Sequence, residues 1–196
     1  MRQLSLLAPA KLRVPDVPGL DYLEEWISAD EERELLAAID REPWKTEWER
    51  RRQIYGLSYG SARSEPRALG PLPSWVAPIA ERVVREGLLE APVVNVVVNE
   101  YLPGQGIGAH HDFPGFGPTV VAVSLGAACV LELLDPESGR KELLDMAPRS
   151  LWILGGEART RWMHAIAHRK TDLIGGEKRP RGRRVSVTMR TARRTA

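Results

Sequence analysis

The sequence predicts an α+β fold in which helices come first and a β-sandwich or barrel follows. Apolar residues at helical spacing occur before residue 92, whereas short runs rich in β-branched residues, separated by turn-forming residues, follow Pro92. The chain also lacks the regular alternation of strand and helix that builds a parallel sheet. Its 196 residues suffice for one domain with a complete hydrophobic core, and two domains would be cramped.

The first part of the chain should be a lead-in followed by a helix. Up to about Gly19 the chain is expected to be irregular, because prolines interrupt it. A helix should begin near Ser28, since Ser28 and Glu31 form the Ser-x-x-Glu pattern of a capping box. Pro43 lies just past its expected end, so we assign residues 1–43 to this part of the domain.

The next segment, residues 44–73, is rich in aromatic, arginine and glycine residues, and we interpret it as a hairpin or long loops. A second helix is predicted over about 74–86, with Gly87 as its stop, inside a region that we bound at 74–91. Residues 92–191 then form the β-rich core. Its predicted strands are Val93–Tyr101, Thr119–Leu125, Cys129–Leu134, Lys141–Leu144, Arg149–Leu154 and Arg184–Arg190.

Composition and charge narrow the class of protein. Hydrophobic residues make up 43% of the chain, and no apolar run reaches the roughly 18 residues of a membrane span. The first ten residues lack the apolar core of a signal peptide. The single cysteine, Cys129, excludes an internal disulfide and a multi-cysteine zinc site. We therefore expect a cytoplasmic monomer without a membrane partner.

The net charge of +2 does not by itself indicate a polyanionic partner, but the arginines are clustered. Arg50, Arg51 and Arg52 are consecutive, and further basic residues crowd the C-terminal end. Such clusters are typical of a path for phosphates. The alternative is a solvated surface with a basic tail.

Candidate metal ligands follow a turn-rich segment after the first core strand. His110 and Asp112 are two residues apart, so in an extended backbone they aim an imidazole and a carboxylate at one point. His164 is far enough downstream to return on another strand as a third ligand. Two histidines and one carboxylate form the facial triad of non-heme Fe(II) oxygenases. Zinc with three such ligands and a water is the chemical alternative.

Taken alone, the His110-x-Asp112 motif is weak evidence for a metal site, and the last predicted strand strengthens it. Arg184, Ser186, Thr188 and Arg190 alternate with apolar residues and therefore share one face. Two arginines on such a face fit a pocket for carboxylates, because a guanidinium binds a carboxylate through two parallel hydrogen bonds. 2-Oxoglutarate carries two carboxylates. The competing interpretation is an edge strand whose arginines lie in solvent.

Taken together, these motifs resemble the AlkB family of Fe(II)/2-oxoglutarate-dependent dioxygenases. The resemblance covers about Arg50 to Arg190 and includes Asn99-x-Tyr101, His110-x-Asp112, His164 and Arg184-x5-Arg190, in that order. It implies a double-stranded β-helix (jelly roll) with N-terminal helices packed outside and a lid segment before the core. It also implies an enzyme that uses Fe(II), 2-oxoglutarate and O2, with oxidation of a substrate C–H bond and formation of succinate and CO2.

The resemblance assigns a role to each matching residue. His110, Asp112 and His164 would hold iron, and Arg184 would pair with the distal carboxylate of 2-oxoglutarate. The other co-substrate contacts would come from Asn99, Tyr101 and Arg190, with Ser186 standing where the family's prototype has Asn. His111 should point away from the metal, and His168 should lie outside the ligand set.

The substrate is harder to assign. By resemblance the nucleotide lid falls in the segment 44–70, where aromatic residues interleaved with arginine suit a flipped or single-stranded base. The candidate contacts are Trp44, Trp48, Arg51, Tyr55 and Tyr59, and the alternative is that the tryptophans pack against the sheet. Our first hypothesis is oxidative demethylation of N-alkylated bases in DNA or RNA. The alternatives are a tRNA wobble-uridine hydroxylase, a hydroxylase of proteins or small molecules, and a non-catalytic nucleic-acid-binding module.

Overall fold

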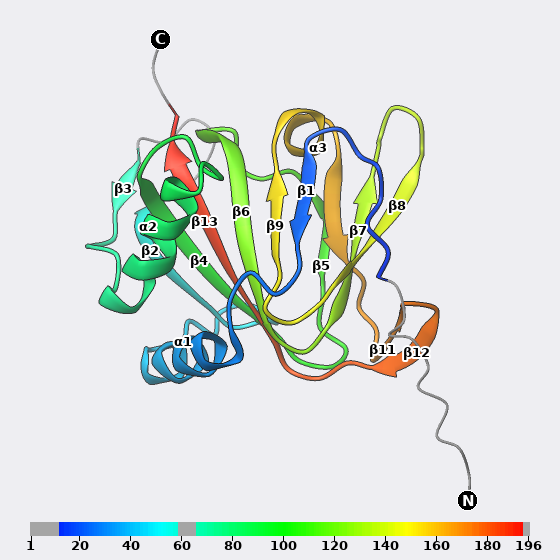
Figure 1. Cartoon of the computed structure of the whole chain (residues 1–196), viewed down its shortest axis with the longest axis horizontal. Coiled ribbons are helices and arrows are strands. Elements are labelled where there is room, and N and C mark those ends of the chain that lie inside the picture. The colour runs from blue at the N-terminus through cyan, green and yellow to red at the C-terminus, as the bar shows by residue number, and fades with distance from the viewer. Residues whose placement is uncertain (1–11, 59–65, 194–196) are drawn as a thin grey trace, which may run out of the picture.

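The computed structural model describes residues 12–58 and 66–193, and it consists of two facing antiparallel sheets with helices outside (Figure 1). The larger sheet has the order β1-β9-β6-β13-β4-β2-β3, and the smaller has the order β5-β10-β7-β8. In the larger sheet these strands are β1 Leu20–Leu23, β9 Leu151–Leu154, β6 Phe116–Gly126, β13 Arg184–Ala192, β4 Val93–Tyr101, β2 Arg52–Ser58 and β3 Arg67–Ala68. In the smaller they are β5 Ile107–His110, β10 Met163–Ile166, β7 Cys129–Leu134 and β8 Lys141–Met146. The predicted jelly roll is confirmed.

Helices cover one side of the larger sheet. Helix α1 (Ala29–Arg41) contacts β6 and helix α2 (Ala77–Arg85) contacts β4 on the outer side of this sheet, whereas the short α3 (Gly156–Thr160) lies at the end of β9 (Figure 1). The 3-10 turn η1 (Ser74–Val76) leads into α2. Among the described residues no helix has the length and hydropathy needed to cross a bilayer.

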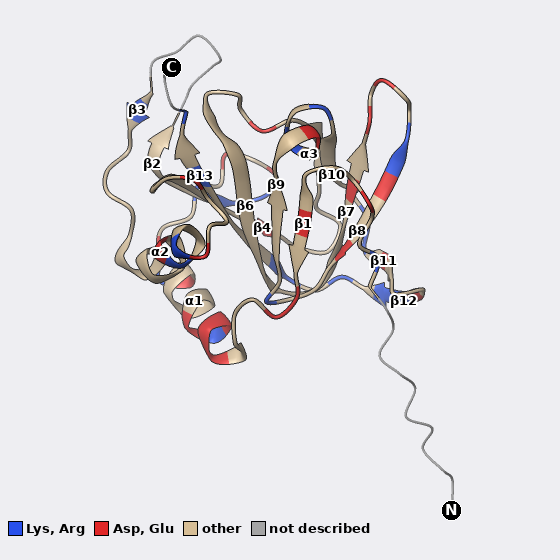
Figure 2. Ribbon diagram, turned by 45° about the horizontal axis from the view of Figure 1, so that its top comes forward, with Lys and Arg blue, Asp and Glu red and all other residues tan. Residues whose placement is uncertain are grey.

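Helix α1 begins where its sequence predicts. The Ser28 hydroxyl accepts a hydrogen bond from the Glu31 backbone N–H at 3.1 Å, and the Ser28 N–H donates to the Glu31 carboxylate at 2.7 Å. The helix buries Leu35 and Ile39 against the sheet, and acidic residues lie along its length (Figure 2), of which Asp30 and Glu34 are exposed. This is the amphipathic pattern expected of a helix packed outside a sheet.

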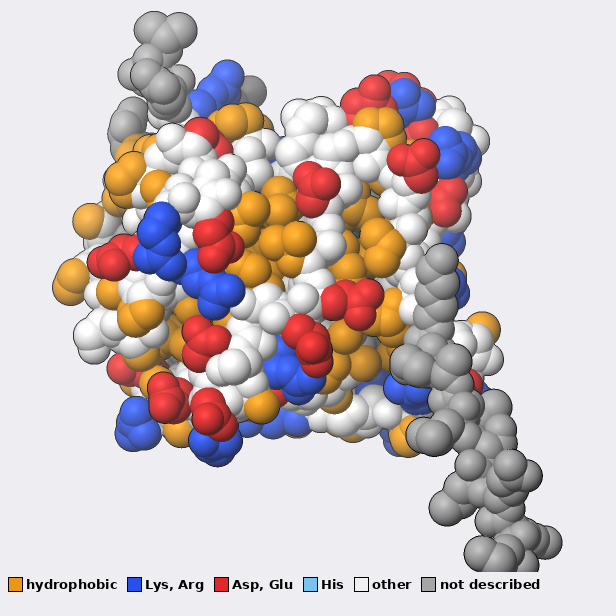
Figure 3. Space-filling view, in the orientation of Figure 1, with side chains coloured by type: hydrophobic (Ala, Val, Ile, Leu, Met, Phe, Trp, Pro, Cys, Tyr) orange, Lys and Arg blue, Asp and Glu red, His pale blue; other side chains and the backbone are white. Residues whose placement is uncertain are grey.

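The core has two parts, one on each side of the larger sheet. The outer part lies between this sheet and the helices, and the inner part fills the space between the two sheets. Ile39, Val83 and Val187 are examples of the first, and Leu133 and Leu154 of the second. Farther from the helices, Figure 3 shows hydrophobic side chains where β6 and β9 lie in Figure 1, although Val121, Val123 and all four residues of β9 are buried.

Several predicted boundaries differ from the structure, for local reasons. Strand β4 and strand β7 have the predicted bounds. Strand β9 begins at Leu151 rather than Arg149, because the backbone of Arg149 has φ +64° and turns away from the extended conformation. Strand β6 begins three residues before Thr119 and tolerates Pro118 because the pairing with β13 is irregular there. The predicted hairpin in the segment 44–73 is present as the antiparallel pair β2 and β3.

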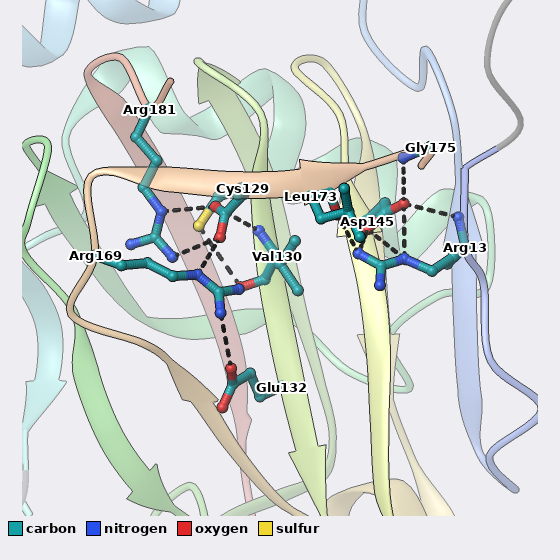
Figure 4. A network of polar contacts seen from close by, with 10 residues as sticks. Arg13, Cys129, Val130, Glu132, Asp145, Arg169, Leu173, Gly175 and Arg181 are labelled. Carbon is teal, nitrogen blue, oxygen red and sulfur yellow. Dashed lines mark hydrogen bonds and ion pairs between the residues drawn. The ribbon is translucent and has the colours of Figure 1, made fainter. Parts of the chain in front are cut away.

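A small additional hairpin precedes β13 and is fixed by buried ion pairs. It consists of β11 (Thr171–Ile174) and β12 (Glu177–Pro180). The Asp172 carboxylate accepts hydrogen bonds from Arg181 Nε at 2.6 Å, from Arg169 Nε at 2.6 Å and from the Val130 backbone N–H at 3.2 Å. Figure 4 shows Arg181 and Arg169 converging beside Val130 of β7. This cluster therefore fixes the chain just before Arg184.

Replacing Asp172 by Asn should destabilise the fold strongly at neutral pH. The Asp172 side chain is fully buried and that of Arg181 is 4% exposed, so the variant leaves a buried guanidinium without its counter-ion. Loss of one partner of a buried ion pair costs about 3–5 kcal/mol. For a chain of this size that lowers the thermal midpoint by roughly 6–20 °C. The matched control is Glu177→Gln, which removes an exposed pair with Arg179 and should leave the midpoint nearly unchanged.

The same pair predicts a pH dependence. Burial alone would raise the pKa of Asp172, but the hydrogen bonds from Arg181 and Arg169 outweigh it and lower the pKa below its ordinary value. A lowered pKa contributes stability that is present above the unfolded-state pKa of about 3.9 and is lost as the pH falls through the folded-state value. The difference in unfolding free energy between wild type and Asp172→Asn should therefore shrink below about pH 4. A constant difference down to acid pH would contradict this account.

Candidate active site

The three predicted metal ligands meet at the open end of the smaller sheet. Strands β5 and β10 pair in antiparallel register with His110 directly opposite His164, and the two imidazole rings lie 4.3 Å apart between centroids. Asp112 follows β5, and its Oδ2 lies 3.8 Å from His164 Nε2. The pairing of β5 with β10 thus explains how a histidine far along the chain joins the His-x-Asp motif.

The hydrogen bonds of His110 and Asp112 leave His110 Nε2 and Asp112 Oδ2 free to bind a cation. His110 Nδ1 lies 2.8 Å from the Gly108 carbonyl, which can only accept, so the proton is on Nδ1 and the lone pair is on Nε2. Asp112 Oδ1 is held by Arg190, whereas Asp112 Oδ2 is buried without a hydrogen-bond partner. A buried acceptor of this kind, beside two imidazoles, fits a cation.

Electrostatics favour the ligand forms of both groups. Burial lowers the pKa of His164 to about 4 despite the attraction of Asp112, so its imidazole is neutral at pH 7. Burial would raise the pKa of Asp112, but the charge of Arg190 and its hydrogen bond hold that pKa well below its ordinary range. Neutral imidazole and ionised carboxylate are the metal-binding forms. In the described part of the chain, no group of three or more His, Cys, Asp or Glu side chains has a geometry that could hold a metal ion as the side chains now lie.

Strands β4 and β13 bring the predicted co-substrate residues together. In their register Arg184 is opposite Tyr101 and Ser186 is opposite Asn99. All four line one small cavity together with the predicted metal ligands and Arg190. Side chains two residues apart share a face on each strand, and the pairing of β4 with β13 then brings these four side chains together.

Arg184 is a buried cation with uncharged neighbours. It is 3% exposed, its Nη2 donates to the Ser124 hydroxyl at 2.9 Å and to the Met146 sulfur at 3.5 Å, and its Nε has no partner. The guanidinium carbon also lies 5.4 Å from the centre of the Tyr101 ring. Burial of a guanidinium without an anion is costly. The cavity thus fits a ligand that supplies a carboxylate at this end.

Arg190 lies at the opposite end of the cavity and contacts the protein itself. Its Nε donates to Asp112 Oδ1 at 3.0 Å and its Nη1 donates to Asn95 Oδ1 at 2.8 Å. Helix α3 supports the same loop, because Arg159 donates to the carbonyls of Asp112 and Phe113 at 2.9 and 2.8 Å. These contacts position the carboxylate of Asp112, a role that the spacing of the arginines did not suggest.

The predicted substrate segment is largely occupied with structural contacts. Arg51 donates to the buried carboxylate of Glu100 at 2.8 Å and lies over the ring of Trp44, which packs against the outer core. The Tyr55 hydroxyl donates to Gln53 at 3.0 Å. These three residues do not line the cavity of the predicted ligands, contrary to the expectation that the segment covers it. Tyr59 lies outside the described residues.

Two side chains of this segment have other positions. Trp48 is 44% exposed, with the Arg52 guanidinium 3.1 Å above its ring. Arg50 points toward the site, because its Nε donates to Asn99 Oδ1 at 3.2 Å. That bond orients the Asn99 amide so that its NH2 group is free to donate.

The remaining two histidines make contacts outside the set of predicted metal ligands. His111 Nε2 donates to the Arg161 carbonyl at 3.0 Å, and His168 Nε2 is 3.3 Å from a Glu49 carboxylate oxygen at the surface. Sequence reasoning missed Trp152, Leu131 and the other apolar residues of the cavity wall. Apolar residues in strands give no local signal of which wall they line.

A second, larger cavity adjoins the predicted metal site. It has a volume of about 780 Å³ and shares Asp112 with the smaller cavity. Its wall includes His111, Phe116, Arg159 and Arg193. Cavities of this size are typical of binding sites for small molecules or single nucleotides.

Comparison with known proteins defines the class. A family model described as the 2OG-Fe(II) oxygenase superfamily matches residues 40–190, and the chain belongs to that superfamily, whose members use Fe(II), 2-oxoglutarate and O2. Within it the chain is a dioxygenase of the AlkB type. It is 30% identical over 203 residues to the "Probable RNA/DNA demethylase ALKBH6" of Danio rerio, with coverage of 88% of this chain and 85% of the relative.

Other relatives are longer than this chain. The "Alkylated DNA repair protein ALKBH8 homolog" of Arabidopsis thaliana is 34% identical over 205 residues, and these cover 91% of this chain and 59% of the relative. The "tRNA (carboxymethyluridine(34)-5-O)-methyltransferase ALKBH8" of Mus musculus is 28% identical over 208 residues, which cover 90% of this chain and 31% of the relative. The chain thus spans only a part of these two proteins.

Solved structures agree with the fold. The structure of OsALKBH1 superposes with a TM-score of 0.66 at 18% identity and covers 89% of this chain and 99% of that one. A Pseudomonas putida prolyl-4-hydroxylase gives a TM-score of 0.59 at 16% identity, with coverage of 90% and 94%. At such identities the similarity concerns the jelly roll alone.

Proposed function

We propose that this dioxygenase oxidatively demethylates N-alkylated bases in DNA or RNA, with Fe(II) held by His110, Asp112 and His164 and 2-oxoglutarate held by Arg184. One observation carries the assignment of the site. Asp112 Oδ2 and Arg184 Nε are a buried acceptor and a buried donor without partners, and both residues line the same cavity. A cation site and an anion site therefore lie in the same cavity, as Fe(II) and a dicarboxylate co-substrate require.

The protein supplies position and exclusion of water. When bound, Fe(II), 2-oxoglutarate and O2 supply the oxidation of a C–H bond, with conversion of 2-oxoglutarate to succinate and CO2. Arg190 holds one oxygen of Asp112 and leaves the other for the metal. Asn99, Tyr101 and Ser186 provide hydrogen bonds around the co-substrate. A hydroxylated N-methyl group then breaks down to formaldehyde and the free amine.

The substrate class rests on the relatives and on the surroundings of the site. A relative matched over most of its length is described as a probable RNA/DNA demethylase. The cavity of about 780 Å³ next to Asp112 has room for a base. A second candidate is hydroxylation of a modified wobble uridine in tRNA, which the likeness to the mouse tRNA methyltransferase supports over 90% of this chain.

The direct test is anaerobic incubation with Fe(II) and 2-oxoglutarate, followed by oxygen and a panel of methylated DNA and RNA oligonucleotides. Mass spectrometry should detect loss of methyl groups with release of formaldehyde and one succinate for each demethylation. Oxygen added to a modified wobble uridine, without demethylation of any panel member, would instead identify the tRNA hydroxylase. Succinate formation that no oligonucleotide stimulates would favour a protein or small-molecule substrate.

Of the predicted substrate contacts, we propose that Trp48 stacks on nucleic acid. Among the aromatic residues of the set that the structure describes, Trp48 is the exposed one, and Arg52 beside it can contact a phosphate. Stacking on an aromatic residue contributes about 1–3 kcal/mol, so Trp48→Ala should weaken binding of a single-stranded oligonucleotide about ten- to a hundred-fold. Fluorescence anisotropy measures this affinity directly.

The control for this prediction is Leu173→Ala, which changes an apolar side chain that is also exposed (52%, against 44% for Trp48) on the separate β11–β12 hairpin. Its affinity should equal that of the wild type. If Trp48→Ala also binds the oligonucleotide as the wild type does, nucleic acid does not bind to the segment around Trp48. The rim of the larger cavity then becomes the site to examine.

A further inference from the structure

Trp152 lines the co-substrate cavity from β9, a strand that carries none of the predicted ligands. It is the second residue of β9, where it pairs with Ala122 of β6, and Ala122 in turn pairs with Thr188 of β13. Trp152 and Thr188 both line the cavity. The indole is 6.0 Å from the imidazole of His164 between ring centres.

The indole N–H of Trp152 is unsatisfied. The residue is 5% exposed and its Nε1 is buried without a hydrogen-bond partner. A tryptophan that is buried to this extent usually donates its N–H to an acceptor, because the group has lost its hydrogen bonds to water. The indole is a donor only, so its missing partner must be an acceptor.

The position of Trp152 along the cavity indicates which acceptor. On β13, Arg184 lies at one end, Arg190 lies at the end near Asp112, and Thr188 lies between them. Trp152 is in the row of Thr188 and close to His164. A dicarboxylate whose far end reaches Arg184 would place its other oxygens near this row. 2-Oxoglutarate carries acceptor oxygens at both of its ends.

We propose that the Trp152 indole N–H donates a hydrogen bond to an oxygen of bound 2-oxoglutarate on the His164 side of the cavity. Trp152 and Arg184 then hold the co-substrate from two directions, and both of their unpartnered donors are satisfied by the same ligand. This inference rests on the proposed assignment of the cavity as the co-substrate site. It adds a residue that neither the sequence motif nor the spacing of the ligands identifies.

The test is the affinity of the full chain for 2-oxoglutarate, measured by calorimetry with Mn(II) in place of Fe(II) so that no turnover occurs. Trp152→Phe keeps an aromatic ring and removes the N–H donor. Loss of a hydrogen bond to a charged acceptor should weaken binding by about ten-fold or more. The affinity for Mn(II) alone and the thermal midpoint should stay near the wild-type values, which separates this role from a structural one.

Trp75→Phe is a matched control. Its Nε1 is also buried without a partner, but Trp75 packs at an angle of 81° on Tyr55 beside the outer core, away from the cavity. This variant should bind 2-oxoglutarate as the wild type does. The same change of residue is therefore made at a site where no ligand is proposed.

Comparison with Arg184→Ala separates a failure of the proposed Trp152 contact from a failure of the proposed co-substrate site itself. Weak binding by both Trp152→Phe and Arg184→Ala supports the donor role of Trp152. Weak binding by Arg184→Ala with wild-type binding by Trp152→Phe overturns that role and leaves the site in place. Wild-type binding by both variants overturns the site itself, and with it the inference.

Discussion

Asp112→Ala should abolish the formation of succinate from 2-oxoglutarate. Asp112 is the single carboxylate beside His110 and His164, and its Oδ2 is the buried acceptor without a partner. Without it the metal would have two protein ligands, and the guanidinium of Arg190 would lose the anion that it now contacts. We expect activity below detection in a succinate assay and a large loss of Mn(II) affinity in calorimetry.

A folded but inactive protein is the informative result for this variant. The hydrophobic cores do not include Asp112, so the circular dichroism spectrum should be preserved. Asp21→Ala, an exposed carboxylate on β1, serves as the control and should retain full activity. Succinate formation at the wild-type rate by Asp112→Ala would exclude Asp112 as a metal ligand.

Arg184→Ala should raise the concentration of 2-oxoglutarate needed for half-maximal activity by about a hundred-fold to a few thousand-fold. Losing one partner of a buried charge pair costs about 3–5 kcal/mol, and each 1.4 kcal/mol is a factor of ten in affinity. The effect should appear in the apparent KM for 2-oxoglutarate, because Arg184 is at the end of the cavity far from Asp112. Oxygen uptake measured over a wide range of 2-oxoglutarate gives this value.

The neighbouring arginine provides the comparison. Arg183 donates to Asp40 at 2.9 Å and to Glu100 at 2.6 Å, and it does not line the cavity. Arg183→Ala should therefore leave the apparent KM for 2-oxoglutarate near the wild-type value, even if it lowers the thermal midpoint. A variant of Arg184 that saturates at the same concentration as the wild type would show that the carboxylate binds elsewhere.

The sequence predicted those parts of the candidate site that depend only on the alternation of side chains along a single strand. The rows Arg184, Ser186 and Arg190 on β13, and Asn99 and Tyr101 on β4, share a face for purely local reasons. His164 could be proposed as a ligand from composition, because the chain has few histidines. Its position opposite His110 depends on the pairing of β5 with β10, which the sequence does not show. The role of Arg190 toward Asp112 likewise depends on two elements meeting in space.

The interpretation of the segment 44–73 shows the limit of composition. Arginines interleaved with aromatic residues suggested a surface for nucleic acid, yet Arg51 pairs with Glu100, 49 residues away, and Trp44 packs beneath it. A sequence does not tell whether an arginine meets a phosphate or a carboxylate of its own chain. Short strands such as β1 and β5, with four residues each, were missed because their pattern is too brief to separate from loop.

The central claim is that one cavity holds the metal and 2-oxoglutarate between β4, β13 and the pair β5 and β10. A crystal structure of the protein with Mn(II) and 2-oxoglutarate, grown without oxygen, tests it most directly. We predict Mn(II) bound to His110, Asp112 and His164, with the distal carboxylate of 2-oxoglutarate on Arg184. A metal bound by other side chains, or a co-substrate that does not contact Arg184, would contradict it.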